Sequence, residues 1–146
     1  MIEFEVPGVP VGNARPRVTR FGTYTPEKTR KYKELIRKTY EKEVGQFIEG
    51  FVGMDIMAYF PIPKSYTKKQ RREIEEHHFW YGKKPDKDNI DKSVMDALNG
   101  IAYKDDSMVV MGRTLKKYCR DDQEPKIIVT LRDMEEKTYE QWGIEA

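Results

Sequence analysis

The sequence predicts an α+β fold: a single domain over residues 1–146, in which helices pack against a mixed or antiparallel sheet of about four strands. Two hydrophobic periods predict this class, because apolar residues alternate in some stretches and recur every three or four residues in others. The length of 146 residues suits one domain with its own hydrophobic core. Apolar residues make up 38% of the chain and charged residues 36%, so we expect a small core beneath a heavily charged surface.

The first half of the chain predicts two strands and a helix. Residues 2–6 alternate apolar side chains with glutamates, which predicts a half-buried strand. Residues 9–24 are rich in Gly, Pro and Arg and predict a loop. A helix should follow, with Thr25 as its cap and Pro26 in its first position. Residues 52–60 alternate over the longest run and are apolar on both faces, which predicts a central strand. The residues expected on the buried side of the first helix are Tyr32, Leu35, Ile36, Thr39 and Tyr40.

The second half predicts further helices and a pair of strands. Residues 64–80 predict a helix with a basic start, capped by Thr67. Residues 108–118 and 126–132 alternate apolar and polar side chains, and we expect these two strands to pair antiparallel across an Asp-Asp turn. A short acidic helix is expected over residues 135–142.

Composition excludes several classes of protein. Cys119 is the only cysteine, so the chain forms no intramolecular disulfide or thiolate metal site, which indicates a reducing cytoplasm. The start of the chain lacks the basic residues and apolar run of a secretion signal. No apolar stretch approaches the length that crosses a membrane.

The charge distribution indicates a polyanionic partner. The formal net charge is only +2, but residues 13–42 hold ten Lys or Arg against three Glu. Residues 64–84 hold seven basic residues against three acidic ones. Basic segments on both sides of an acidic cluster suit an enzyme that binds a polyanion. The alternative is a set of ordinary solvated helix faces, which charge runs usually are.

The acidic cluster lies on and around one more predicted helix. Residues 90–101 carry apolar side chains at helical spacing, and an Asn-Gly pair supplies the stop. Asp86 lies just before this helix and Asp88 at its start. Lys92 is four residues after Asp88, so the two share a helix face. The Asp105-Asp106 pair follows a few residues after the helix ends.

This cluster predicts a site for a hard cation. Carboxylate oxygens are the ligands that Mg²⁺ prefers, and crowded carboxylates are costly unless a cation neutralises them. Taken singly, Asp88 is also typical of a helix cap and Asp105-Asp106 of a turn. A calcium-binding EF-hand loop starting at Asp86 is excluded, because Ile90 would occupy a ligand position and Asp91 the required glycine.

The joint pattern is far more specific than its parts. Residues 84–92 read Lys-Pro-Asp-x-Asp-Asn-x-x-Lys and are followed by Asp-Ala-Leu-Asn-Gly and then Asp-Asp. This pattern closely resembles the core motif of the RusA family of Holliday junction resolvases, which are divalent-metal endonucleases of bacteria and their phages. Pro7-Gly8-x-Pro10 and Arg15-Pro16-Arg17 also resemble the opening of phage-type members. The resemblance covers most of the chain and is weakest over residues 64–81 and the C-terminal tail.

The resemblance implies a single RusA-like endonuclease domain over residues 1–146, cytoplasmic and encoded by a bacterium or a prophage. It implies resolution of four-way DNA junctions by paired hydrolysis of phosphodiester bonds in DNA recombination and repair. A homodimer, branched DNA as partner, Mg²⁺ as cofactor with Mn²⁺ as a substitute, no small-molecule cofactor and no membrane are implied as well. The implied catalytic residues are Asp86, Asp88, Lys92 and Asp106. The implied metal ligands are Asp86, Asp88 and Asp106, with Asp105 as a further candidate.

Basic residues outside the motif are candidates for DNA contacts. Phe21 and Tyr24 lie among the first group of arginines and are placed to stack on bases, although a surface loop without a partner is the alternative. The His77-His78 pair lacks the carboxylate spacing of a metal site. The residues predicted to bind DNA are Arg15, Arg17, Arg20, Lys69, Arg71 and Arg72.

Two other functions remain open from the sequence. One is a DNA-binding protein without catalysis, in which the acidic cluster is structural. The other is a metal-dependent nuclease that acts on other branched DNA, such as flaps or replication forks. For Lys92 the alternative to catalysis is an ion pair within the helix, with Asp88 or Asp96. If the chain dimerises, the exposed apolar residues of the sheet are the candidates for the interface, namely Phe51, Met57 and Tyr59.

Overall fold

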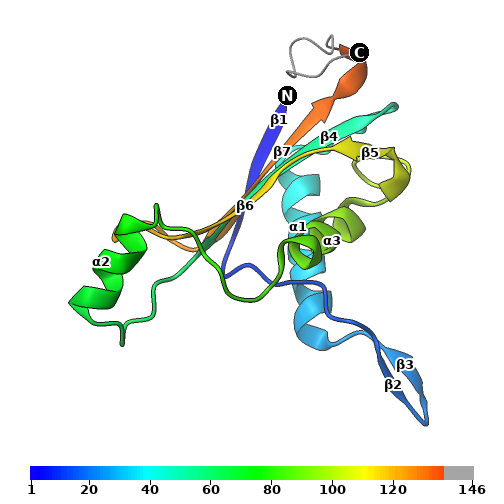
Figure 1. Cartoon of the computed structure of the whole chain (residues 1–146). Helices are drawn as coiled ribbons and strands as arrows, with labels where there is room; N and C mark the ends of the chain where they lie inside the picture. Colours follow the sequence, from blue (N-terminus) through cyan, green and yellow to red (C-terminus); the bar gives the residue numbers. More distant parts are fainter. Residues whose placement is uncertain (137–146) are drawn as a thin grey trace.

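A computed structural model describes residues 1–136 of the chain, and its described part has the predicted α+β architecture (Figure 1). One five-stranded sheet forms the centre, and α1 and α3 pack against one of its faces. The acidic helix expected over residues 135–142 lies outside the described residues, apart from its first two positions. None of the helices in residues 1–136 has the length and hydropathy of a membrane-spanning segment. In chain order the elements are β1 (Ile2–Pro7), β2 (Arg17–Thr19), β3 (Gly22–Tyr24), α1 (Glu27–Glu43), β4 (Val52–Phe60), α2 (Lys68–Glu76), α3 (Lys87–Leu98), η1 (Asp106–Met108), β5 (Val109–Met111), β6 (Thr114–Tyr118), β7 (Lys126–Asp133) and η2 (Met134–Glu136).

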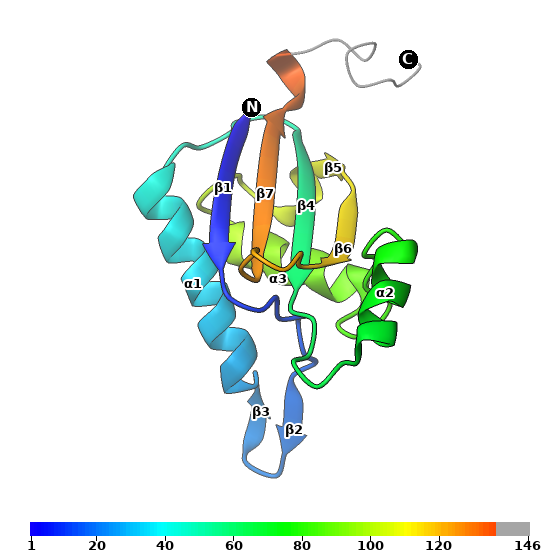
Figure 2. The same cartoon turned by 90° about the vertical axis from the view of Figure 1, so that its left-hand side faces the viewer.

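The sheet is mixed and has five strands, in the order β1-β7-β4 with β5 and β6 along the far side of β4. Strand β4 pairs antiparallel with β7 and parallel with β5 and β6, so its predicted central position is confirmed (Figure 2). The predicted pairing of residues 108–118 with 126–132 is wrong, because β4 lies between β6 and β7. Chain neighbours usually pair, but here the connection passes the end of β4, where the Cys119 amide donates to the Phe60 carbonyl at 2.7 Å.

The strand predicted over residues 108–118 is divided in two. Gly112 separates β5 from β6, and a side chain there would place its Cβ 1.6 Å from the carbonyl oxygen of Met54. The backbone of Gly112 therefore approaches β4 more closely than any other residue type allows. Beyond this point, the Arg113 carbonyl accepts from the Ile56 amide at 2.8 Å and parallel pairing resumes.

Helices α1 and α3 cover one face of the sheet and bury the core between them and the strands (Figures 1 and 2). From α1 the core receives Tyr32, Ile36 and Tyr40, whereas Leu35, which we expected to be buried, is 39% exposed. The predicted cap is also corrected, because Pro26 occupies the N-cap position of α1 and no side chain caps the helix. Proline has no side-chain acceptor, so it cannot cap the helix, which begins at Glu27.

Two other segments differ from the prediction. Residues 9–24 contain the short hairpin of β2 and β3 rather than loop alone, and its fully exposed strands give no hydrophobic alternation to detect. Helix α2 ends at Glu76 instead of continuing to residue 80, and it buries no residue. Its predicted start is confirmed, since the Thr67 hydroxyl accepts from the Gln70 amide in a capping box.

The other face of the sheet is not covered by any element of residues 1–136 (Figure 2). Its side chains mix half-buried apolar residues, including Met57 and Tyr59, with ion pairs. One pair joins Arg132 to Asp55 at 2.8 Å, and a second joins Lys126 to Glu5 at 3.2 Å.

The approach of Gly112 to β4 predicts a local test of the fold. Gly112→Ala should lower the free energy of unfolding by about 3 kcal/mol, because the new methyl group overlaps the Met54 backbone. Gly82→Ala is the matched control, since a Cβ at Gly82 meets nothing within 4 Å. Urea denaturation measures both variants, and equal stabilities would contradict the described close approach of Gly112 to β4.

Candidate active site

The N-terminal end of α3 presents two carboxylates that form no hydrogen bond or ion pair within residues 1–136. Asp86 occupies the N-cap position, yet its side chain makes no capping hydrogen bond. Asp88 lies in the first turn and is exposed. No ion pair or side-chain hydrogen bond involves either residue within the described part of the chain. Neither carboxylate is therefore explained as a helix cap.

Lys92 lies on the same exposed face of α3. The opposite face packs into the core through Ile90 and Val94, so Asp88 and Lys92 point away from the sheet. Asp96, one turn further on, pairs instead with Lys33 of α1 at 3.1 Å. Across residues 1–136, Lys92 forms no ion pair, so the structural alternative that we weighed for it is not observed.

The segment before the hairpin holds the start of α3 in place. The Asn13 amide donates to the Asn89 carbonyl at 2.8 Å, and the Ser93 hydroxyl donates to the Val11 carbonyl at 2.9 Å. Gly12 fits against Pro85 so closely that a Cβ would lie 2.6 Å from the proline ring. The N-terminal loop and the motif therefore form one unit. The polar Ser93 among apolar helix positions was the only sequence signal of this contact.

The chain turns back after α3 and brings the second acidic pair to the helix. Gly100 has φ +82°, a conformation that glycine adopts readily, as the predicted helix stop requires. Tyr103 is fully buried, and its hydroxyl donates to the Met95 carbonyl of α3 at 2.8 Å. Asp106 follows and lies beside Asp96, a residue that the sequence argument considered only as a partner for Lys92.

Asp105 and Asp106 are shifted in opposite directions. Burial, followed by the neighbouring Asp96 carboxylate, raises the pKa of Asp106. Its Oδ1 atom is buried without a hydrogen-bond partner. Hydrogen bonds from Ser107 hold the pKa of Asp105 below its usual value, and the Ser107 amide lies 3.1 Å from Asp105 Oδ2. Asp106 is thus the carboxylate that the fold leaves uncompensated.

This donor set fits a divalent cation in chemistry. A cation that binds oxygen would offset the repulsion between Asp96 and Asp106. The unpartnered Oδ1 of Asp106 could then act as one of its ligands. Within residues 1–136, no three His, Cys, Asp or Glu side chains form a group able to hold a metal. Asp96 lies about 12 Å along the helix axis from Asp88. The predicted ligands therefore form two groups, Asp86 with Asp88 and Asp105 with Asp106, and the structure does not bring all of them together.

Basic residues line a cleft of about 650 Å³ beside the start of α3. The cleft joins the N-terminal loop to the motif, and it brings two of the six predicted DNA-binding residues next to Asp86. Arg20 lies at the tip of the hairpin, and Lys69, Arg71 and Arg72 belong to α2 and do not line this cleft. Lys28 and Lys84, which we did not predict as DNA contacts, do line it. The charged and polar side chains of the cleft are Asn13, Arg15, Arg17, Lys28, Thr29, Lys84, Asp86 and Asn89.

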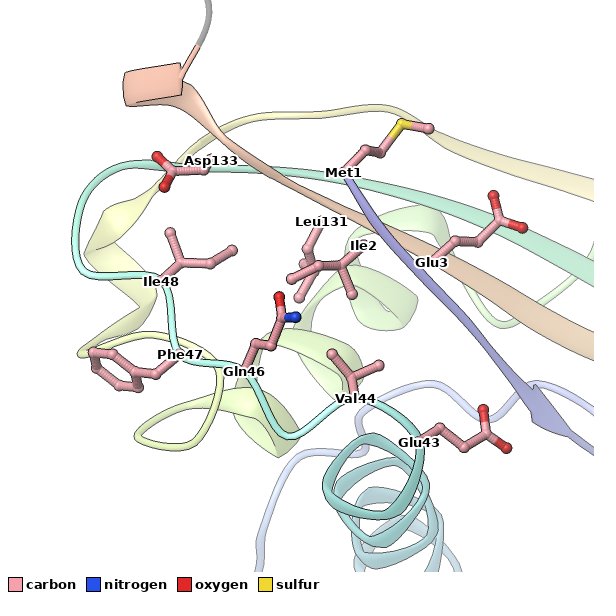
Figure 3. Close-up of a pocket in the computed structure, with 10 residues that line it drawn as sticks. All are labelled: Met1, Ile2, Glu3, Glu43, Val44, Gln46, Phe47, Ile48, Leu131 and Asp133. Carbon is pink, nitrogen blue, oxygen red and sulfur yellow. The ribbon is translucent and has the colours of Figure 1, made fainter.

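Other candidate groups do not form a competing site. Burial raises the pKa of the Cys119 thiol, which disfavours the reactive thiolate. Tyr81 stacks on Phe60 with ring centres 3.8 Å apart, so it packs against the body of the protein. A separate pocket of about 400 Å³ lies between the start of β1 and the end of α1 (Figure 3). None of the predicted site residues lines that pocket.

Comparison with known proteins places the chain among nucleases. The family model described as endodeoxyribonuclease RusA matches residues 7–132, which include the motif, the hairpin and β7. The chain is also 36% identical over 142 residues to the uncharacterized protein YqaN of Bacillus subtilis (strain 168). That match covers 91% of this chain and 96% of YqaN.

The electrostatics of Asp106 predict an unusual stability effect. A raised pKa means that the folded protein holds the Asp106 proton more tightly than the unfolded chain does. This stabilisation is present below the unfolded pKa and is lost as the pH rises through the folded one. Asp106→Asn should therefore raise the melting temperature at neutral pH without divalent cations, by a few degrees at most.

The neighbouring carboxylate supplies the matched control. Asp105→Asn should lower the melting temperature at neutral pH, because the pKa of Asp105 is held down by Ser107 in the folded state. Thermal melts between acid and neutral pH measure both variants. Shifts of the same sign at neutral pH would contradict the described environments.

Proposed function

Because the chain belongs to the RusA family of endodeoxyribonucleases, we propose that it resolves four-way DNA junctions by hydrolysing phosphodiester bonds in recombination and repair. The observation that carries this proposal is the start of α3, where Asp86 and Asp88 are exposed beside a cleft with basic walls. A polyanion in that cleft is attracted by the basic side chains and brings a phosphate toward the carboxylates. A purely structural role for the acidic cluster is disfavoured, since these two side chains have no partner in residues 1–136.

In this proposal Asp86 and Asp88 hold Mg²⁺ at the start of α3, and Asp106 belongs to the second group of ligands, with Asp105 as a further ligand and Mn²⁺ as a substitute metal. When bound, the cation supplies an activated water and offsets charge on the phosphate. Asp96 lies beside Asp106 and adds negative charge to that group of ligands. Asp105 is exposed in this turn, and its Oδ2 accepts a hydrogen bond from the Ser107 amide, so it is a further candidate ligand.

Lys92 acts on the phosphate rather than on the metal. Its ammonium group is exposed on the helix face that carries Asp88 and is not engaged in an ion pair among the described residues. In this proposal it contacts the scissile phosphate or orients the attacking water. Such a preorganised charge stabilises the transition state more than it does the ground state.

A homodimer supplies one active site for each of two opposed strands of a four-way junction. The uncovered sheet face supports this part of the proposal, because it carries the half-buried Met57 and Tyr59. Phe51 lies next to the start of β4 and is 48% exposed. These residues give a twofold contact an apolar centre surrounded by ion pairs.

The first test of this function uses the two exposed carboxylates. Asp86→Asn and Asp88→Asn should each reduce cleavage of a labelled four-way junction at least a hundredfold in Mg²⁺, while junction binding persists. The substrates include linear duplex, flap and fork DNA, which separates a resolvase from a nuclease for other branches. EDTA should abolish cleavage by the unchanged protein. Wild-type rates in both variants would refute the assignment of these ligands.

The role of Lys92 predicts a separate kinetic result. Lys92→Ala should slow single-turnover cleavage of a saturated junction by on the order of a hundredfold. Lys92→Arg should restore little, because the larger planar guanidinium does not replace a compact ammonium. Lys87→Ala is the control on the same helix, since it removes only the exposed pair with Asp91. Equal rates for Lys92→Ala and Lys87→Ala would assign Lys92 to the solvated surface.

A further inference from the structure

The hairpin of β2 and β3 projects from the body of the protein beyond the start of α1 (Figures 1 and 2). Every residue from Arg15 to Thr25 is exposed, so the ribbon packs against no core. Phe21 stands in the turn and is 86% exposed, and Val18 is 81% exposed. An aromatic side chain this exposed buries little apolar surface when the chain folds.

The turn that carries Phe21 is ordered by its own hydrogen bonds. The Phe21 amide donates to the Thr19 hydroxyl oxygen at 3.2 Å, and that hydroxyl donates to the Gly22 carbonyl at 3.1 Å. Gly22 has φ +124°, which side chains rarely allow. The guanidinium of Arg20 lies 4.9 Å from the centre of the Phe21 ring. One face of the ring is thus covered by a cation, and the ring remains 86% exposed.

The positive charge of the ribbon favours a polyanionic partner. Residues 13–24 contain three arginines and no acidic residue. Isolated exposed apolar residues are common on protein surfaces, but here Phe21 lies among arginines on a projecting ribbon. Apolar side chains that wedge between base steps are flanked in this way by cations that bind phosphates.

The base of the ribbon is continuous with the candidate active site. Arg15 and Arg17 line the same cleft as Asp86, and Arg17 begins β2. A strand of three residues spans about 10 Å. This length matches about three base steps at 3.4 Å each along one strand. A phosphate near Asp86 therefore places the tip of the ribbon a few steps away on the same DNA.

We propose that this hairpin recognises the branch point of the DNA, with Phe21 inserted against an unstacked base and Arg17 and Arg20 on the flanking phosphates. The inference rests on the proposed function, since it names how that site selects branched DNA. Bases at a crossover have lost a stacking neighbour, so Phe21 replaces an interaction already missing there. In continuous duplex the same insertion must first separate two stacked bases, which disfavours it. The hairpin thus provides selection by structure and not by sequence.

The test uses a four-way junction with 2-aminopurine at the branch point, bound by protein that carries Asp88→Asn to prevent cleavage. Binding should change the 2-aminopurine emission, and adding Phe21→Ala should abolish the change. The same substitution should weaken junction binding about tenfold, as expected for loss of one base-stacking side chain. Binding to linear duplex should change less than twofold. Phe21→Trp should retain both the emission change and the affinity.

Val18→Ala is the matched control, because Val18 is equally exposed on the same ribbon but lies away from the turn. Its junction affinity should stay within twofold of the parent. An unchanged emission signal in Phe21→Ala, or equal losses on junction and duplex, would overturn base insertion. If Phe21→Ala dissociated a dimer in sedimentation, base insertion would be overturned too, because the tip of the hairpin would then contact a second copy of the chain. Failure of the proposed function is read separately, from Mg²⁺-dependent cleavage by the unchanged protein.

Discussion

The burial of one face of α3 against the sheet is the constraint on which the candidate site depends. Ile90, Val94 and Leu98 are fully buried, and they fix the rotation of the helix about its axis. Because helix faces are set by spacing, this rotation turns Asp88 and Lys92 toward solvent. The core thus determines which way the motif faces, although no motif carboxylate belongs to the core. The segment around Gly12 then fixes the axial position of the helix through its close fit to Pro85.

The same structure leaves one acidic residue of the candidate site in unfavourable surroundings. Asp106 is partly desolvated beside Asp96, and its Oδ1 has no partner, although the buried Tyr103 holds the returning chain firmly in place. The desolvated Asp106 lowers the stability of the folded protein. The arrangement persists because the surrounding packing contributes enough stability to maintain it. Residues that oppose stability in this way are typical of sites that act on a ligand.

The sequence was informative wherever periodicity or spacing reflects local structure. The alternation of residues 52–60 predicted the central strand, and the Asn99-Gly100 stop predicted the end of α3. The order of strands was not predictable, because β6 and β7 have similar patterns and the chain between them passes the end of β4 near Cys119, so that β4 lies between the two. Asp96 was noted only for its spacing from Lys92, since its proximity to Asp106 arises from the turn at Gly100 and not from the helix alone.

The hairpin and the motif show why a charge pattern alone could not define a DNA site. Arg15 and Arg17 line the cleft beside Asp86, whereas Arg71 and Arg72 lie on α2, which buries nothing and does not line that cleft. Both groups have similar charge in the sequence, and only the fold separates them. The segment just before the ribbon of residues 17–24 is joined to α3, because the Val11 carbonyl accepts from Ser93 and the Asn13 amide donates to Asn89. In the proposed function, a duplex arm bound by the ribbon would therefore lie close to the carboxylates, which links recognition of the branch to placement of the phosphate.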